Sequence, residues 1–598
     1  MPTTRRDLFK FVGGSAAGAL LTPAPWRLIT DSALWSENWP GIPRPLRGEI
    51  RARYTNCSLC PAGCAVRARC VGDQPVSLAG VKDHPLSHGA LCPWGIAAHH
   101  LPYHPARLRQ APVEQAKGAV ADALARRGPN ERVALIDLRP GRTASWTYRR
   151  AMAALANGTY IATSEPEWGV DLEAARTVLS LGAGLADGWG TPGNVFAARN
   201  HFRLIQADAT ETRTAAFADV WLPVRAGSES ALAAAVAGEI GMAEAARATG
   251  VEEKQIADVI AELRSGGPSV VLAGHACAEV ARANAALGAP GRTLLARRET
   301  PVPAAWQKCA PVTALEAVPD GSIGVLFIDE SVPGEYIPWS AIAPKLAANQ
   351  PLVVAFAWTA EGYGKHARFT LPAPVFGEAA DDIPAAVDGV AAAFRLATPL
   401  VTPQAAVVNP AEFVAGLAGL KGGDALRERA DAICQAGRGQ VFTPADGKTT
   451  PIKEMKADDF WKALNTGACW MDERAPQIGG RASEVGATPG WQAEAPAPLF
   501  PLAIVIGDSA GPPLSSPLSS KLYRESSLRQ PPDRIELAPE TARAAGVADG
   551  SRAVLETAGA RVPVVVALDA GLPPGVVRMA GGSTAGDLAN ARGKVVPA

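Results

Sequence analysis

Four cysteines close to the N-terminus constrain this chain more than any other feature. Cys57, Cys60 and Cys64 lie on one short stretch, and Cys92 follows after 27 intervening residues. Gly63 keeps the loop before the third cysteine out of regular helix, so backbone amides can turn toward a bound group. Four thiolates in this arrangement suit a cubane iron–sulfur cluster. We therefore predict one [4Fe-4S] cluster, with these four cysteines as its cofactor-binding and metal ligands.

A structural zinc site with four cysteine ligands is the alternative. Such sites usually present two Cys-x2-Cys pairs, whereas the fourth cysteine here stands alone before Pro93. Cys70 lies on a short alternating stretch and is expected to pack in a strand rather than to bind metal. The other cysteines have no neighbour at ligand spacing and are expected to be small buried hydrophobes. They are Cys277, Cys309, Cys434 and Cys469.

Residues 1–25 have the layout of a targeting segment. Arg5 and Arg6 precede an apolar stretch over 11–21, and prolines follow it. The stretch is short and glycine-rich for a membrane span. An ordinary amphipathic helix is the alternative, although adjacent glycines disfavour it. The segment resembles a twin-arginine export signal, which implies a periplasmic protein that folds and takes up its cofactor before export.

Length and charge set broad limits on the rest of the chain. The 598 residues exceed the size at which one hydrophobic core stops growing, so several domains are expected. The 58 basic and 58 acidic residues leave a formal net charge of zero. No nucleic-acid partner is expected, because a polyanion binder needs an excess of positive charge.

The pattern of the remaining chain predicts α/β units followed by a β-rich C-terminal part. Short apolar runs ending in turn residues predict buried parallel strands, with ligands beyond their carboxyl ends. These runs are 133–137, 270–274, 325–329 and 352–356. Gly182–Gly184, Asp208 and Asp329 would fall at such ends, although a lone Gly-x-Gly is more often a turn than a nucleotide site. Alternation over 534–537, 553–557 and 562–566 predicts a barrel, with a helix over 539–546.

Three segments around the cysteines resemble the N-terminal cluster domain of molybdenum and tungsten bis-pterin oxidoreductases. They are 54–64, 84–95 and 103–108. In catalytic members of that family, a Lys or Arg commonly lies two residues after the last cysteine, between cluster and pterin. Trp94 occupies that position here. A neutral indole does not supply the same charge, which puts the route from cluster to pterin in doubt.

The same resemblance continues over 208–232, where the family frame is kept but ligand residues have drifted. Ala209 and Thr210 stand where active relatives usually have Pro and Arg. The segment between Gly158 and Leu179 is short, and in active relatives the longer equivalent carries the residue that ligates the metal. Ser164 is the sole candidate left. These departures imply that the Mo-bis-MGD cofactor is not bound.

Further segments resemble the molybdopterin-oxidoreductase-like subunit of periplasmic menaquinone reductase complexes. They are 165–173, 185–190, 371–384 and 515–526. The resemblance implies one cluster, no molybdenum cofactor, and electron flow from periplasmic cytochromes c toward a membrane quinone. It also implies three partners: a ferredoxin-like iron–sulfur subunit, a multihaem cytochrome c and an integral membrane quinone-interacting subunit. The protein would then associate with the membrane through these partners.

The expected fold class is multi-domain α/β, with an N-terminal [4Fe-4S] domain, two Rossmann-like α/β domains and a C-terminal β-barrel. The barrel resembles the dinucleotide-binding domain of the same family, but we expect it to serve as a packing domain. The expected boundaries are 1–25 for the signal, 45–110 for the cluster domain, 111–149 with 313–490 for the first α/β domain, 150–312 for the second and 491–598 for the barrel.

Two functions remain open on the sequence. The first is a non-catalytic iron–sulfur electron-transfer subunit of a quinone-linked respiratory complex, with no catalytic residues of its own. The second is an active molybdenum or tungsten oxidoreductase, for instance one that reduces polysulfide or thiosulfate, which needs two pterin dinucleotides and a metal ligand or open position.

Overall fold

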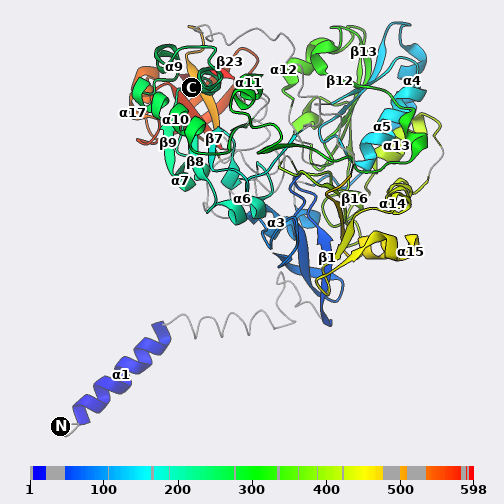
Figure 1. The fold of residues 1–598 in the computed structure, drawn as a ribbon, viewed down its shortest axis with the longest axis horizontal. Helices are drawn as coiled ribbons and strands as arrows, with labels where there is room; N and C mark the ends of the chain where they lie inside the picture. Colours follow the sequence, from blue (N-terminus) through cyan, green and yellow to red (C-terminus); the bar gives the residue numbers. More distant parts are fainter. Residues whose placement is uncertain are drawn as a thin grey trace.

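The described part of the chain is a multi-domain α/β structure with a small cysteine-bearing domain and a closed C-terminal barrel (Figure 1). These features were predicted from the sequence and are confirmed. The computed structural model describes residues 5–21, 48–104, 107–162, 168–187, 189–274, 278–332, 337–360, 362–386, 388–420, 423–475, 498–507, 534–580, 588 and 591–598.

The cysteine-bearing domain is a three-stranded antiparallel sheet. Its strands β1 (Ile50–Asn56), β2 (Ala65–Val71) and β3 (Gln74–Gly80) pair in sequence order. Burial alternates along β2, and Cys70 is fully buried within it, so its predicted packing role is confirmed. Helix α3 (Pro93–Ala97) follows the fourth cysteine directly. In Figure 1 this domain lies below both α/β lobes.

A six-stranded parallel sheet forms the first lobe. The strands, in spatial order, are β12 (Val312–Thr313), β5 (Gly158–Ile161), β4 (Arg132–Asp137), β13 (Ile323–Asp329), β14 (Leu352–Ala357) and β15 (Phe369–Pro372). Alternate residues of β4 point to opposite faces. Val133 and Leu135 pack with helices α4 (Val113–Arg126) and α5 (Thr143–Ala154), while Ala134 and Ile136 face a second core. Burial on both faces explains the apolar runs that predicted these strands.

The core of the cysteine domain is continuous with this lobe. Leu59, Val66 and Leu101 belong to the same cluster of buried side chains as Leu135 and Phe327. The cysteine loop is therefore held against the six-stranded sheet by apolar packing, which is non-directional but large in sum.

The second lobe is a four-stranded parallel sheet of β10 (Ser269–Ala273), β7 (Thr177–Leu181), β8 (Arg203–Asp208) and β9 (Val220–Pro223), in that spatial order. The boundary expected at residue 150 falls inside α5. Because parallel pairing needs a crossover, α5 returns the chain so that β5 pairs with β4 in the first lobe. The second lobe therefore begins later than predicted.

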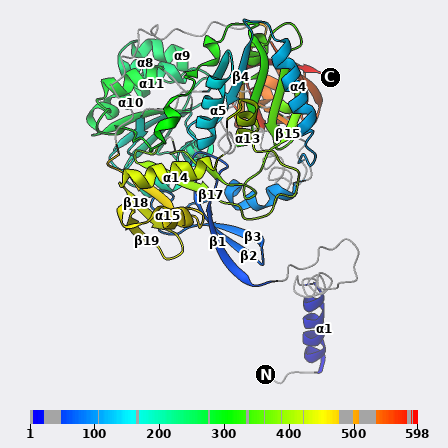
Figure 2. The same ribbon diagram turned by 90° about the vertical axis from the view of Figure 1, so that its right-hand side faces the viewer.

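A five-stranded antiparallel sheet was not predicted. Its spatial order is β16 (Asp381–Asp382), β17 (Ala392–Ala397), β20 (Cys469–Asp472), β18 (Gln440–Thr443) and β19 (Lys448–Pro451). Its strands are short and come from distant parts of the chain, separated by helices such as α14 (Ala425–Ala436) and α15 (Ala457–Leu464). Local patterning gives little signal for such a sheet. In Figure 2 it lies beside β1, which contacts β17.

The C-terminal barrel matches the predicted strands closely. It closes in the order β21 (Leu502–Gly507), β25 (Val576–Ala580), β22 (Arg534–Leu537), β24 (Arg561–Leu568), β23 (Arg552–Thr557) and β26 (Arg592–Pro597). Helix α17 (Pro539–Ala545) ends at Gly546, whose φ of 69° suits a glycine cap.

Near the N-terminus, α1 (Arg5–Leu21) is an α-helix that Figure 1 draws apart from the lobes. Its Phe9 and Phe11 side chains are exposed. No helix in the described ranges has the length and apolar character needed to cross a membrane.

The contact between the cysteine domain and the second lobe yields a stability prediction. A Cβ on Gly193, in helix α6 (Pro192–Ala198), would lie 2.0 Å from the carbonyl oxygen of Ser87. We expect Gly193→Ala to lower the free energy of unfolding by about 1–3 kcal/mol, through overpacking against backbone. Gly118 is a matched control, because a Cβ there meets nothing within 4 Å inside α4. Gly118→Ala should stabilise by about 0.5–1 kcal/mol. Thermal unfolding followed by circular dichroism measures both, and equal midpoints for the two variants would contradict the assigned contact.

Candidate functional site

The fold brings the four predicted cysteines to one place. Cys57 follows β1, and Cys64 precedes β2, so both ends of the loop are fixed by the sheet. The Cys57 N–H donates to the Cys64 carbonyl at 2.8 Å, and the Gly63 N–H donates to the Cys60 carbonyl at 3.2 Å. Cys92 caps the N-terminus of α3, where its sulfur accepts from the Gly95 N–H at 3.5 Å. Sequence spacing alone predicted this grouping.

The electrostatics of the thiols reflect their burial and closeness. Cys57 and Cys64 are each 4% exposed, whereas Cys60 and Cys92 are half-buried. Burial raises the pKa of the Cys57 thiol well above its ordinary value, and the three other thiols raise it further. Burial, followed by Cys60, raises the pKa of Cys92 to about 11. Thiolates form here only if a positive group offsets these costs, and metal ions are such groups.

Two buried arginines lie against the cysteine loop. Arg139, just after β4, donates to the carbonyl oxygens of Ser58 and Cys60, the latter at 2.7 Å. Arg395, on β17, is 1% exposed. A Cβ on Gly63 would lie 2.6 Å from its guanidinium carbon, so the glycine makes room for it. The left-handed φ of 56° at Gly63 also favours glycine.

His84 organises the loop that leads to Cys92. Its Nδ1 accepts from the backbone N–H groups of Leu86 and Ser87, each at 3.3 Å. Burial, followed by the charges of Arg395 and His88, lowers the pKa of His84 to about 3. The ring is therefore neutral and caps the loop.

The surroundings of the thiols fit an anionic group. In the described part of the chain, buried N–H donors without a hydrogen-bond partner include Nε of Arg139, Nε and Nη1 of Arg395, and Nε2 of His84. Buried donors cost free energy unless something accepts from them. Across the described ranges, no three His, Cys, Asp or Glu side chains group closely enough for one metal ion. A cubane holds its thiolates further apart than a single ion does, because several irons stand between them.

The other residues singled out by sequence fall in different places. Trp94 is half-buried and packs against the core shared with the six-stranded sheet. Cys469 is fully buried as expected, whereas Cys309 and Cys434 are only half-buried, which corrects the prediction for them. Ser164 and Cys277 lie outside the described residues.

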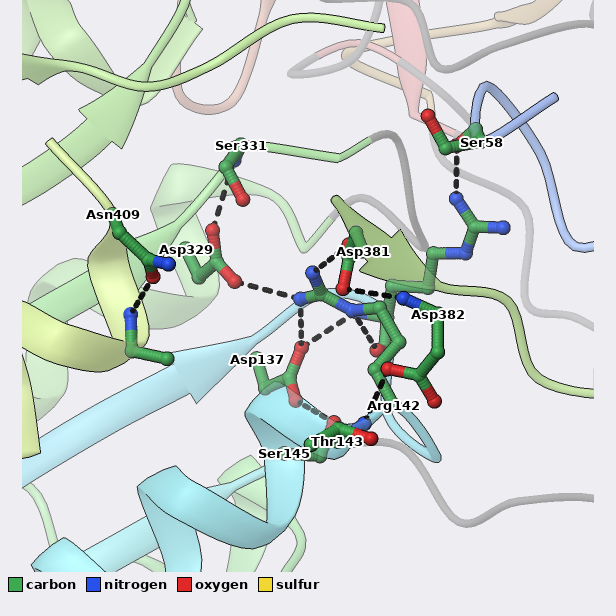
Figure 3. Close-up of polar contacts among 12 residues, drawn as sticks. Ser58, Asp137, Arg142, Thr143, Ser145, Asp329, Ser331, Asp381, Asp382 and Asn409 are labelled. Carbon is green, nitrogen blue, oxygen red and sulfur yellow. Dashed lines mark hydrogen bonds and ion pairs between the residues drawn. The ribbon is translucent and has the colours of Figure 1, made fainter. Parts of the chain in front are cut away.

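A second polar site lies at the carboxyl ends of β4 and β13 (Figure 3). Arg142 is an ion-pair partner of Asp137 at 3.3 Å, Asp329 at 2.7 Å and Asp381 at 3.0 Å. Burial raises the pKa of Asp329, but the Arg142 charge, together with hydrogen bonds from Ser331, Tyr148 and Arg142, lowers the net pKa below its ordinary value. Tyr148 donates to the same Asp329 carboxylate at 2.7 Å. The guanidinium is thus neutralised by the protein itself.

Two further buried aspartates lie at helix N-termini, one in each lobe. The backbone N–H of Thr143, at the start of α5, donates to Asp382 at 2.7 Å. The backbone N–H of Thr191, at the start of α6, donates to Asp388 at 3.0 Å, and Asn194 donates to the same carboxylate. Both aspartates are buried. Segment 381–388 therefore supplies a carboxylate to one helix of each lobe.

A cavity of about 570 Å³ opens beside the Arg142 site. Its lining includes Asp381 and Arg142, together with residues of α14 and of helix α13 (Pro410–Leu417). Its charged lining residues are Arg142, Arg150, Asp381, Glu412, Asp424 and Glu428. Acidic groups outnumber basic ones in this list.

The residues that the sequence placed at strand ends do not gather at one site. Asp208 ends β8 in the second lobe, where Gln206 donates to it at 3.2 Å and burial raises its pKa. Asp329 ends β13 in the first lobe, and Gly182, with φ of 65°, forms the turn after β7. The structure therefore places these residues in two lobes, each with partners from its own surroundings.

Sequence reasoning missed the arginines. Arg139 and Arg142 follow a buried strand directly, a position where ligands of parallel sheets are expected, so their location carried a signal. Arg395 is a single charge within the apolar run Ala-Ala-Phe-Arg-Leu-Ala. A lone charge in such a run indicates a buried charge, but it does not say which group lies opposite.

The buried neutral His84 yields a pH prediction. Unfolded histidine takes up a proton below about pH 6.5, whereas His84 in the fold does so only near pH 3. The unfolded state binds more protons between these values, so stability is lost as the pH falls below about 6.5. We expect His84→Asn, which keeps an acceptor for the loop, to reduce this pH dependence. Thermal unfolding at pH 5.0 and 7.5 tests it, and an unchanged difference between the two pH values would contradict the assignment.

Comparisons with known proteins agree with this geometry. Residues 50–104 match the molybdopterin oxidoreductase Fe4S4 domain, and residues 517–596 match the molybdopterin dinucleotide-binding domain. The chain is 30% identical, over 273 residues, to the menaquinone reductase, molybdopterin-binding-like subunit of Nitratidesulfovibrio vulgaris. That alignment covers 40% of this chain and 40% of the relative's length.

Among solved structures, acetylene hydratase from Pelobacter acetylenicus is similar in fold. The TM-score is 0.68 at 15% identity, covering 91% of this chain and 100% of that chain. At this identity the likeness concerns the fold alone. The cysteine domain and the C-terminal barrel region are thus the parts of this chain that match two domains of molybdopterin oxidoreductases.

Proposed function

We propose that this protein is an iron–sulfur electron-transfer subunit of a membrane-associated, quinone-linked respiratory complex. Cys57, Cys60, Cys64 and Cys92 hold one [4Fe-4S] cluster, and the Mo-bis-MGD cofactor is not bound. The observation that carries the proposal is the contrast between two sites. Beside the cysteine loop, Arg139 and Arg395 have buried N–H donors with no partner among the described residues, whereas the Arg142 charge at the sheet ends is already paired.

The cluster assignment rests on the fit between the site and an anionic group. When bound, the cluster would accept and release single electrons. The chain's own residues position and shield it. Arg139 fixes the loop through two carbonyl oxygens, and the Gly95 N–H donates to the Cys92 sulfur. The match of this segment to the Fe4S4 domain supports the same assignment.

The first lobe does not fit a pterin dinucleotide. Pyrophosphate groups bind at helix N-termini, where backbone N–H groups and the helix dipole favour negative charge. At the start of α5 that role is filled by the Asp382 carboxylate. The cations at this helix start are already paired, Arg142 with three aspartates and Arg429 with Asp382 at 2.8 Å, so they have little charge left to attract a phosphate.

The second lobe does not fit a pterin dinucleotide either. The N-terminus of α6 is taken by Asp388, which is buried against Thr191 and Asn194. In the first lobe, the mainly acidic lining of the cavity beside Arg142 would likewise repel a polyphosphate. We also infer that the two parallel sheets are Rossmann-like units, which keep the family architecture without its usual ligand.

An active molybdenum or tungsten oxidoreductase is the second candidate. The match of residues 517–596 to a dinucleotide-binding domain favours it. We take the barrel as a packing domain, because the carboxylates at α5 and α6 oppose dinucleotide binding elsewhere in the chain.

The setting of the protein is inferred from the relative and the N-terminus. The printed name of the Nitratidesulfovibrio vulgaris protein describes a menaquinone reductase subunit, which supports a quinone-linked complex here. We propose a ferredoxin-like subunit, a multihaem cytochrome c and an integral membrane quinone-interacting subunit as partners. The paired Arg5 and Arg6 support export by the twin-arginine route and a periplasmic location, with membrane association through the partners.

Metal content is the decisive test of the proposed function. Protein purified anaerobically from its native membranes should contain about four iron atoms per chain and no molybdenum, tungsten or pterin fluorescence. Reduction with dithionite should produce an electron paramagnetic resonance signal. Stoichiometric molybdenum or tungsten would establish the second candidate, and iron-free protein would reject both the cluster and the electron-transfer role.

The cysteines themselves give a matched pair of variants. We expect Cys57→Ala to lose most of the iron and the visible absorbance, because one of four ligands is removed. Cys70→Ala is the control, since Cys70 is equally buried in the neighbouring strand but lies outside the ligand set. It should keep wild-type iron. Equal iron in both variants would exclude Cys57 as a ligand.

A further inference from the structure

Arg395 is a buried cation that forms no ion pair with any carboxylate of the described residues. It lies on β17, opposite Cys469 of β20 in the antiparallel register, and is 1% exposed. Within the described part of the chain, its Nε and Nη1 atoms have no hydrogen-bond partner and no carboxylate forms an ion pair with it. Arg142, which is similarly buried, pairs with three carboxylates. A buried charge is rarely left uncompensated in a folded protein.

The side chain of Arg395 faces the cysteine loop. Its Cζ and Nη2 atoms would each lie 2.6 Å from a Cβ placed on Gly63. At this contact the guanidinium lowers the pKa of Cys64, against the larger raising effect of burial. The same positive charge helps to keep His84 neutral. Arg395 therefore lies beside Gly63 and close enough for its charge to act on the Cys64 thiol.

Neighbouring groups do not provide an equivalent free charge. The two terminal nitrogens of Arg139 are engaged with loop carbonyls. Burial, followed by the charge of Arg142, lowers the pKa of Arg139 to about 10. Helix α3, which follows the fourth cysteine, has the sequence Pro-Trp-Gly-Ile-Ala and carries no charge.

We propose that Arg395 is the counter-charge of the iron–sulfur cluster and raises its reduction potential. The inference rests on the proposed function, since it requires a cluster on the four cysteines. Reduction adds one electron to an already anionic cluster, and a nearby buried cation stabilises the added negative charge more than it stabilises the oxidised form. The free N–H groups of Arg395 would donate toward the cluster or its thiolates. Arg395 does not itself carry the electron; its charge sets the potential of the group that does.

The test is a redox titration of the purified holoprotein, followed by electron paramagnetic resonance. Arg395→Gln removes the charge while keeping N–H donors and much of the volume. We expect its equilibrium constant for reduction to fall about tenfold, which lowers the potential by about 59 mV for one electron. Arg395→Lys keeps the charge and should remain closer to the wild type. Arg67→Gln is the control, because Arg67 is exposed on β2 three residues after Cys64 and its charge is screened by water.

Each outcome decides the question. A wild-type potential in an Arg395→Gln variant with full iron content would overturn the inference, as would equal shifts in Arg395→Gln and Arg67→Gln. If Arg395→Gln loses its iron, retention of iron by Arg395→Lys supports a charge role, and loss in both variants reduces Arg395 to a packing residue. Iron-free wild-type protein would reject the proposed function instead, so the two failures are distinguishable.

Discussion

Charge that leaves water must be balanced inside the protein, and this requirement organises the interior of the molecule. The charge of Arg142 is balanced by three aspartates from β4, β13 and β16. These ion pairs join the three strands at the carboxyl ends of β4 and β13. The charge of Arg395 is not balanced by any carboxylate in the described ranges. The first arrangement is complete without a ligand, whereas the second calls for an anion. The cysteine loop is the place where such an anion would be held.

The packing of the domains brings these charges to their positions. The cysteine domain shares an apolar core with the six-stranded sheet, and Arg139 from that sheet donates to the loop after β1. Arg395 reaches the same loop from β17, which belongs to a different sheet. Gly63 allows this approach because it has no Cβ and adopts a positive φ. The site therefore depends on three separate parts of the chain, joined by hydrophobic burial.

Carboxylates of the chain also occupy positions where a fold of this kind could bind the phosphates of a ligand. Parallel α/β sheets bind phosphates where helix N-termini face the crevice beyond the strands. Here segment 381–388 places Asp382 and Asp388 at two such termini, one in each lobe. Carboxylates of the chain itself therefore accept from the backbone donors at these two helix starts. An electron-transfer role needs only the cluster, its ligands and a suitable local charge.

The sequence by itself predicted the grouping of the cysteines, strands β4, β13 and β14 of the first parallel sheet, β10 of the second, and three strands of the barrel. Buried strands give unbroken apolar runs, and Cys57, Cys60 and Cys64 are neighbours through covalent spacing alone. The antiparallel sheet, the transfer of β5 to the first lobe and the partners of Arg395 were decided only by the tertiary structure. Short strands such as β16 and β20 carry little local pattern. The environment of a buried charge is set by residues hundreds of positions away, as Gly63 and Arg395 are, and no local spacing encodes such a contact.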